Sequence, residues 1–137
     1  MRFMIIVKGN RDSEAGVMPD EALMAAMATY HEELAKAGVL LDASGLKASS
    51  HGWRIKYSGD QRTVTDGPFA ETKELLAGYT IIRVNSREEA LAWTNRYPNP
   101  AGRGKPAEIE VRQMFEMEDF EPNAATERFR ELETVTR

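Results

Sequence analysis

The stretch from Asp66 to Glu74 sets a glycine and a proline between two segments that have the composition of β-strands. Proline fixes φ and has no amide hydrogen to donate, so Gly67 and Pro68 together exclude a helix or the interior of a sheet at this point. The same stretch carries three carboxylates and one lysine. Charged turns held between strands commonly carry binding groups, so the sequence predicts a turn here and a candidate functional loop.

In the rest of the chain, the spacing of apolar residues alternates between the period of a helix and the period of a strand. Leu23, Met27, Tyr30 and Leu34 recur at helical spacing, and residues 53–57 alternate apolar with basic side chains, as a half-buried strand does. The predicted elements are a strand at 3–8, a polar loop at 9–18, a helix at 19–37, an extended segment at 39–41, strands at 53–57 and 63–65, a central strand at 75–84, a helix between 86 and 98 with Ser86 as its cap, a strand at 109–115 and a short C-terminal helix.

This order resembles the ferredoxin-like plan (βαββαβ), an α+β fold in which two helices cover one face of an antiparallel sheet. In the first strand Phe3, Ile5 and Val7 project to one face, and Met4 and Ile6 project to the other. Both faces are apolar, whereas the predicted helices suffice for one of them. The sequence therefore predicts a ferredoxin-like domain with a hairpin insertion that forms a homodimer, sheet against sheet.

The composition narrows the choice of partners. The chain has 137 residues, of which 42% are hydrophobic and 29% charged, and its formal net charge is −4. This length fits one compact domain, and the mildly acidic balance does not favour nucleic acid or an anionic membrane as a partner. No apolar run approaches the ~20 residues that span a bilayer, and residues 1–10 lack the features of a signal peptide. The expected location is cytoplasmic.

The residue inventory also limits the chemistry. The chain has no cysteine, which excludes disulfides, thiolate nucleophiles and cysteine-ligated metals. Its two histidines, His31 and His51, are too few for a three-histidine metal site. Neither a metal nor a cofactor is therefore predicted.

The run from Asp66 to Glu74 reads DGPFAETKE, and it resembles the signature of a subgroup of the YCII-related family, whose folds belong to the dimeric α/β-barrel superfamily. Shorter stretches, among them Ala77–Tyr79 and Glu108–Arg112, are also similar to this family. The resemblance extends to Phe120. It implies a YCII-related domain over residues 1–120, and the helical spacing of Ala125, Phe129 and Leu132 predicts a C-terminal docking helix or tail over residues 121–137.

The resemblance also carries functional expectations. Structural relatives in the superfamily resemble muconolactone isomerases and related lactone-processing enzymes, and some family members look encoded beside extracytoplasmic-function sigma factors. The family resemblance further implies a catalytic His–Asp pair, for which the candidates are His31 and Asp66. In such a pair the carboxylate fixes the imidazole tautomer and the other ring nitrogen can take a proton. The alternatives are a helix-surface His31 and an Asp66 that caps its own turn.

Four further side chains are candidates for ligand binding: Glu71, Lys73, Arg83 and Arg112. Lys73 would bind an anionic group, or else belong to a solvated ion-pair cluster with its neighbouring glutamates. Arg112 lies in opposite phase to the apolar residues of the last strand, where its planar fork would clamp a carboxylate. An exposed or interface position is the alternative for Arg112 and Arg83.

Three hypotheses of function follow, and the sequence leaves open whether the protein is an enzyme. In the first, a cofactor-independent enzyme acts on a small organic acid or lactone by acid/base chemistry, with Asp66 and His31 as acid and base. In the second, the protein is a non-catalytic small-molecule-binding or regulatory interaction protein associated with an extracytoplasmic-function sigma factor pathway. In the third, the 66–74 loop is purely architectural and builds the dimer.

Overall fold

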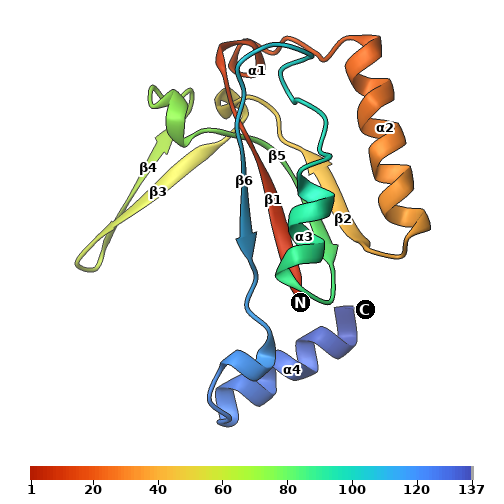
Figure 1. The fold of residues 1–137 in the computed structure, drawn as a ribbon. Coiled ribbons are helices and arrows are strands. Elements are labelled where there is room, and N and C mark those ends of the chain that lie inside the picture. Colours follow the sequence, from red (N-terminus) through yellow and green to blue (C-terminus); the bar gives the residue numbers. More distant parts are fainter. Residues whose placement is uncertain (137) are drawn as a thin grey trace.

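A four-stranded antiparallel sheet organises the chain, and a two-stranded hairpin and a C-terminal helix project from it (Figure 1). The computed structural model describes residues 1–136, except for the side chains of Thr72 and of residues 134–136. The strands are β1 (Arg2–Lys8), β2 (Leu40–Gly45), β3 (Trp53–Ser58), β4 (Gln61–Asp66), β5 (Leu76–Arg83) and β6 (Ile109–Gln113). The helices are α1 (Arg11–Glu14), α2 (Glu21–Lys36), α3 (Arg87–Thr94) and α4 (Ala124–Thr136), and short 3-10 turns lie at Ser49–His51, Thr72–Glu74 and Met117–Asp119.

The main sheet has the strand order β2-β5-β1-β6, and every neighbouring pair in it is antiparallel. β1 is therefore central, between β5 and β6, which follow much later in the sequence. Helix α2 connects β1 to β2, and α3 connects β5 to β6. This arrangement is consistent with the predicted ferredoxin-like α+β fold. The predicted hairpin insertion is formed by β3 and β4, between β2 and β5.

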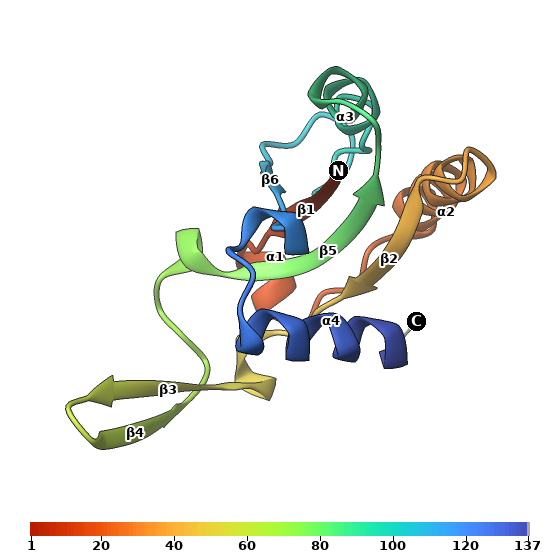
Figure 2. The ribbon, with the colours of Figure 1, turned by 90° about the horizontal axis from the view of Figure 1, so that it is seen from below.

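The core lies between one face of the sheet and the helices α2 and α3. Ile5 of β1, Ile82 of β5 and Leu34 of α2 are fully buried, and Tyr30 and Ala90 pack in the same cluster. Figure 2 shows both helices on the same side of the sheet. The face of α2 that was predicted from helical spacing is thus the face that packs on the sheet.

Side-chain caps determine where the two longer core helices begin. Asp20 Oδ1 accepts a 2.8 Å hydrogen bond from the backbone N–H of Leu23, so α2 begins at Glu21 rather than at the predicted Pro19. The predicted cap at Ser86 is confirmed, because its hydroxyl accepts a 3.1 Å hydrogen bond from the first turn of α3.

The opposite face of the sheet, called here the open face, is apolar at its centre and charged at its edge. Met4 of β1 and Ile81 of β5 are half-buried cross-strand neighbours on this face. At the β6 edge, Glu110 lies 3.3 Å from Lys8 and 3.2 Å from Arg112. The open face therefore carries both apolar and charged side chains, because β6 contributes charged residues to it. The sequence of β1 alone had predicted an apolar face.

Candidate functional site

The signature loop, defined here as residues 66–74, returns the chain from the hairpin to the main sheet. Gly67 N–H donates a 3.0 Å hydrogen bond to the carbonyl oxygen of Gly52, and the peptide bond between Gly67 and Pro68 is cis. A Cβ atom on Gly67 would lie 1.9 Å from the carbonyl oxygen of Ser49, closer than Cβ atoms approach in proteins. The turn predicted from the sequence is thus a close crossing of two backbone segments that admits only glycine.

Ser49 joins this crossing to α1. Its hydroxyl donates to Glu14 Oε1, and its backbone N–H donates to Glu14 Oε2 at 2.8 Å. The N–H of Phe69 in turn donates to the Ser49 hydroxyl oxygen at 3.0 Å. Helix α1, which the sequence patterns did not predict, is held by a capping box between Asn10 and Ser13. Three segments that are distant in sequence therefore meet at one hydroxyl group.

The Glu14 carboxylate makes this junction sensitive to pH. The hydroxyl and then the amide hydrogen bond from Ser49 hold the pKa of Glu14 below its ordinary value of 4.5. A carboxyl group whose pKa is lowered by folding stabilises the fold above its unfolded pKa, and this contribution is lost as the pH falls through its folded pKa.

Ser49→Ala is expected to lower the free energy of unfolding by about 1 kcal/mol at neutral pH, because it removes the hydroxyl that links Glu14 to Phe69. The difference from wild type is expected to shrink well below pH 4.5, where Glu14 is protonated in both folded proteins. Urea denaturation at neutral and acid pH measures both values. An equal difference at the two pH values would contradict a role for the Glu14 carboxylate.

Arg54 of β3 is fixed over the signature loop. Its guanidinium carbon lies 3.9 Å from the centroid of the Phe69 ring, and its Nη1 donates a 3.2 Å hydrogen bond to Glu71 Oε2. The pKa of Glu71 is lowered first by a hydrogen bond from its own backbone and then by Arg54. Glu71, which was predicted to bind ligand, is thus the anionic partner of Arg54 in this structure.

A pocket of about 420 Å³ lies beside the signature loop, between the base of the hairpin and the start of β5. Its wall contains the basic side chains of Lys47, His51 and Arg54, the ring of Phe69, the carboxylate of Glu74 and several leucines. The combination of the Lys47 ammonium and the Arg54 guanidinium with an apolar surface suits a small anion that has an apolar body.

His31 lies on α2, against the sheet. Its Nδ1 is 2.7 Å from the carbonyl oxygen of Met27, which can only accept, so Nδ1 carries a hydrogen. Its Nε2 is 2.9 Å from the hydroxyl of Thr80, and that hydroxyl also makes a hydrogen bond with Tyr97. Asp66 is exposed at the end of β4, and Figures 1 and 2 show α2 and the hairpin on opposite sides of the molecule. Within one chain the structure does not bring His31 and Asp66 together, and their catalytic roles stay predictions.

The other predicted ligand-binding residues divide between two places. Arg112 lies on the open face, with its exposed guanidinium 3.2 Å from Glu110. Arg83 is exposed at the end of β5, in phase with Ile81 and thus on the same face. Lys73 is exposed in the 3-10 turn of the signature loop. Lys73 therefore belongs with the loop, and the two arginines belong with the open face.

The part of the chain that the structure describes contains neither a metal-ligand cluster nor a membrane-spanning helix. No group of three or more His, Cys, Asp or Glu side chains in it is placed to hold a metal ion. None of its helices combines the length and the apolar content that crossing a bilayer requires.

The sheet order, the inserted hairpin and the loop-lined pocket define a small α+β domain with an antiparallel sheet. The chain belongs to the YCII-related domain family, whose sequence model matches residues 1–118, and the family resemblance stated from the sequence is thereby confirmed. An uncharacterised protein of Rhizobium meliloti is 32% identical to it over 80 residues, which is 58% of this chain. The match spans 64% of that relative, which is less than two thirds of its length.

Proposed function

We propose that this protein binds a small organic acid in the pocket beside the signature loop. The proposal depends on one observation, the presence of Lys47, His51 and Arg54 together in the wall of a pocket of about 420 Å³. The Lys47 ammonium and the Arg54 guanidinium would meet a carboxylate, while Phe69 and the neighbouring leucines would contact the apolar body of the ligand. The volume falls within the roughly 300–1,000 Å³ of small-molecule sites.

Arg54 is ordered before any ligand arrives, which supports this proposal. The Phe69 ring and the Glu71 carboxylate hold its guanidinium in place. Fewer side-chain rotations are then lost on binding, so more of the interaction contributes to affinity. Arg54 uses only its Nη1 for the hydrogen bond to Glu71. Because a guanidinium has five N–H donors, its other N–H groups can bind the carboxylate of a ligand.

His51 supplies the same pocket with a group for proton transfer. Histidine is the side chain that exchanges a proton near neutral pH, and it is the commonest general acid or base. A cofactor-independent enzyme acting on a small organic acid or lactone would use His51 at this position. The alternative, a binding protein in an extracytoplasmic-function sigma factor pathway, needs the same pocket without proton transfer.

We also propose that a second copy of the chain covers the open face, giving the dimeric α/β barrel expected from the family resemblance. Met4 and Ile81 form an apolar centre, and the ion pairs of Glu110 lie at its edge. An apolar centre with a charged rim is the usual composition of a subunit interface. A twofold axis would set this surface against itself.

Arg54→Met is expected to weaken binding of a small carboxylate by roughly 10- to 100-fold, because one charge-assisted hydrogen bond is lost. The probes are benzoate, succinate and cis,cis-muconate, measured by titration calorimetry. A thermal-shift screen comes first, because a bound ligand raises apparent stability by mass action.

Arg62→Met is the matched control, because Arg62 also stacks on an aromatic ring, 4.9 Å from the centroid of Tyr57, but does not line the pocket. Arg62→Met is expected to retain the affinity of wild type. Equal affinities for the Arg54 and Arg62 variants, or no binding of any of the three acids by wild type, would contradict the proposal.

A further inference from the structure

The pocket beside the signature loop carries charges of both signs. Lys47 and Arg54 are basic, and Glu74 at the end of the loop contributes a carboxylate to the same wall. The ring of Phe69 and three leucines add apolar surface. A pocket that presents both charges beside an apolar surface differs from a site for a simple anion, because the few polar groups of a pocket decide which ligand fits it.

Glu74 has no partner within the part of the chain whose side chains the structure describes. None of Lys47, His51 and Arg54 lies within ion-pair distance of its carboxylate, and no described group donates a hydrogen bond to that carboxylate. Arg54 pairs instead with Glu71, which does not line the pocket. The carboxylate of Glu74 is therefore available to a ligand.

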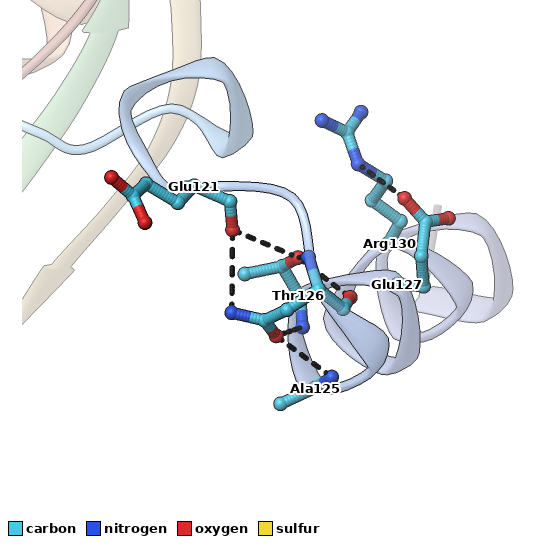
Figure 3. A network of polar contacts seen from close by, with 6 residues as sticks. Glu121, Ala125, Thr126, Glu127 and Arg130 are labelled. Carbon is cyan, nitrogen blue, oxygen red and sulfur yellow. Dashed lines mark hydrogen bonds and ion pairs between the residues drawn. The ribbon is translucent and has the colours of Figure 1, made fainter.

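At other places in the chain, neighbouring opposite charges pair with each other. Glu110 lies 3.3 Å from Lys8 and 3.2 Å from Arg112. In α4, Glu127 Oε1 lies 3.4 Å from Arg130 Nε (Figure 3). Such pairs satisfy their charges without a ligand. In the pocket wall, by contrast, the carboxylate of Glu74 and the basic groups share one surface and stay apart, so a molecule that carries both charges can bridge them.

A ligand with a carboxylate alone complements this wall only in part. Its carboxylate would accept hydrogen bonds from Arg54 and Lys47, but it would also bring a second negative charge near Glu74. An ionised carboxylate such as that of Glu74 only accepts hydrogen bonds, so its complement in a ligand is a donor. An ammonium group is a donor with the opposite charge, which makes it the strongest complement.

We propose that the ligand of this pocket is zwitterionic: an amino acid with an apolar side chain, or a molecule with the same three groups. Arg54 and Lys47 bind its carboxylate, Glu74 binds its ammonium group, and Phe69 contacts its side chain. Glu74 is then the residue that determines specificity. This inference rests on the proposed function, because it names the class of organic acid that the proposed site prefers.

The test compares ligands that differ in one group. L-Phenylalanine and 3-phenylpropionate share a carboxylate and a phenyl ring, and only L-phenylalanine has an ammonium group. Titration calorimetry with the full chain near neutral pH is expected to show about tenfold or more tighter binding of L-phenylalanine, because one charge-assisted hydrogen bond is added. 3-Phenyllactate, which has a hydroxyl in place of the ammonium group, is expected to bind less tightly than L-phenylalanine.

Glu74→Gln removes the charge and keeps the shape of the side chain. In this variant the affinities for L-phenylalanine and 3-phenylpropionate are expected to differ by no more than about twofold, because the attraction to the ammonium group and the repulsion of the carboxylate are both lost. Glu32→Gln is the matched control, because it makes the same change of charge at an exposed position of α2 that does not line the pocket. Circular dichroism of each variant establishes that it is folded.

Loss of the preference in Glu74→Gln, with the preference retained in Glu32→Gln, supports the inference. Three results would overturn it: equal affinity of wild type for L-phenylalanine and 3-phenylpropionate, equal affinity for L-phenylalanine and 3-phenyllactate, or a preference that survives in Glu74→Gln. In each of these cases 3-phenylpropionate still binds, so the proposed site for organic acids would stand. If wild type binds none of the three compounds, the proposed site is wrong and the inference is wrong with it.

Discussion

Replacing Gly67 by alanine is expected to lower the free energy of unfolding by about 3 kcal/mol. The added Cβ would lie 1.9 Å from the carbonyl oxygen of Ser49 and 2.6 Å from its carbonyl carbon. Both of those atoms belong to the backbone, so no change of rotamer relieves the contact and the two segments must separate. Their separation would also lengthen the hydrogen bond from Phe69 N–H to the Ser49 hydroxyl. Urea denaturation followed by tryptophan fluorescence measures the loss.

Gly52→Ala is the matched control, because a Cβ on Gly52 would meet the same carbonyl oxygen of Ser49 at 3.8 Å. That distance is an ordinary contact, and the φ of −136° at Gly52 suits any residue. The control is expected to change the free energy of unfolding by no more than about 0.5 kcal/mol. Equal destabilisation by both substitutions would show that the crossing at Gly67 is not the cause.

Leu34→Ala is expected to lower the free energy of unfolding by about 3 kcal/mol, through lost apolar burial and the cavity that remains. Leu34 is 0% exposed, and it packs between α2 and the sheet in the cluster that contains Ile5 and Ile82. The urea midpoint of the variant measures the effect. A large value would show that α2 is held to the sheet by this residue and not only by its own helical propensity.

Leu91→Ala makes the same chemical change on α3, where Leu91 is 51% exposed. Its expected effect is about 0.5 kcal/mol or less, because little apolar area returns to water and alanine favours the helix. If the two variants lose equal stability, the core does not lie where the burial of Leu34 places it.

The elements that carry a periodic apolar pattern were predictable from the sequence. The alternation of apolar and basic residues predicted β3, and helical spacing predicted the buried face of α2. The capping residue Ser86 predicted the start of α3. Helix α1 was missed because its four residues are too few to show a period. Its signal was the pair Asn10 and Ser13, whose side chains cap the turn reciprocally, and that pair lay within a segment that was predicted to be a polar loop.

The candidate site was predictable in position but not in composition. The Gly-Pro break located the loop, and Glu71 and Lys73 are found there. The sequence did not single out His51 as a site residue, and Arg54 served only as a basic residue in an alternating strand. Both line the pocket because the signature loop and the start of β5 fold back against the base of the hairpin, and contacts between segments that are distant in sequence leave no local pattern.

The hairpin is closed at its base, where Gly67 N–H meets the carbonyl of Gly52 at 3.0 Å. The chain therefore departs and returns at nearly the same point, and the register between β2 and β5 does not depend on how long the excursion is. We therefore expect insertions and deletions in the hairpin to leave the main sheet intact and to alter the rim of the adjoining pocket. The shape of the pocket can thus change through the hairpin alone, while the packing of the sheet against its helices stays the same.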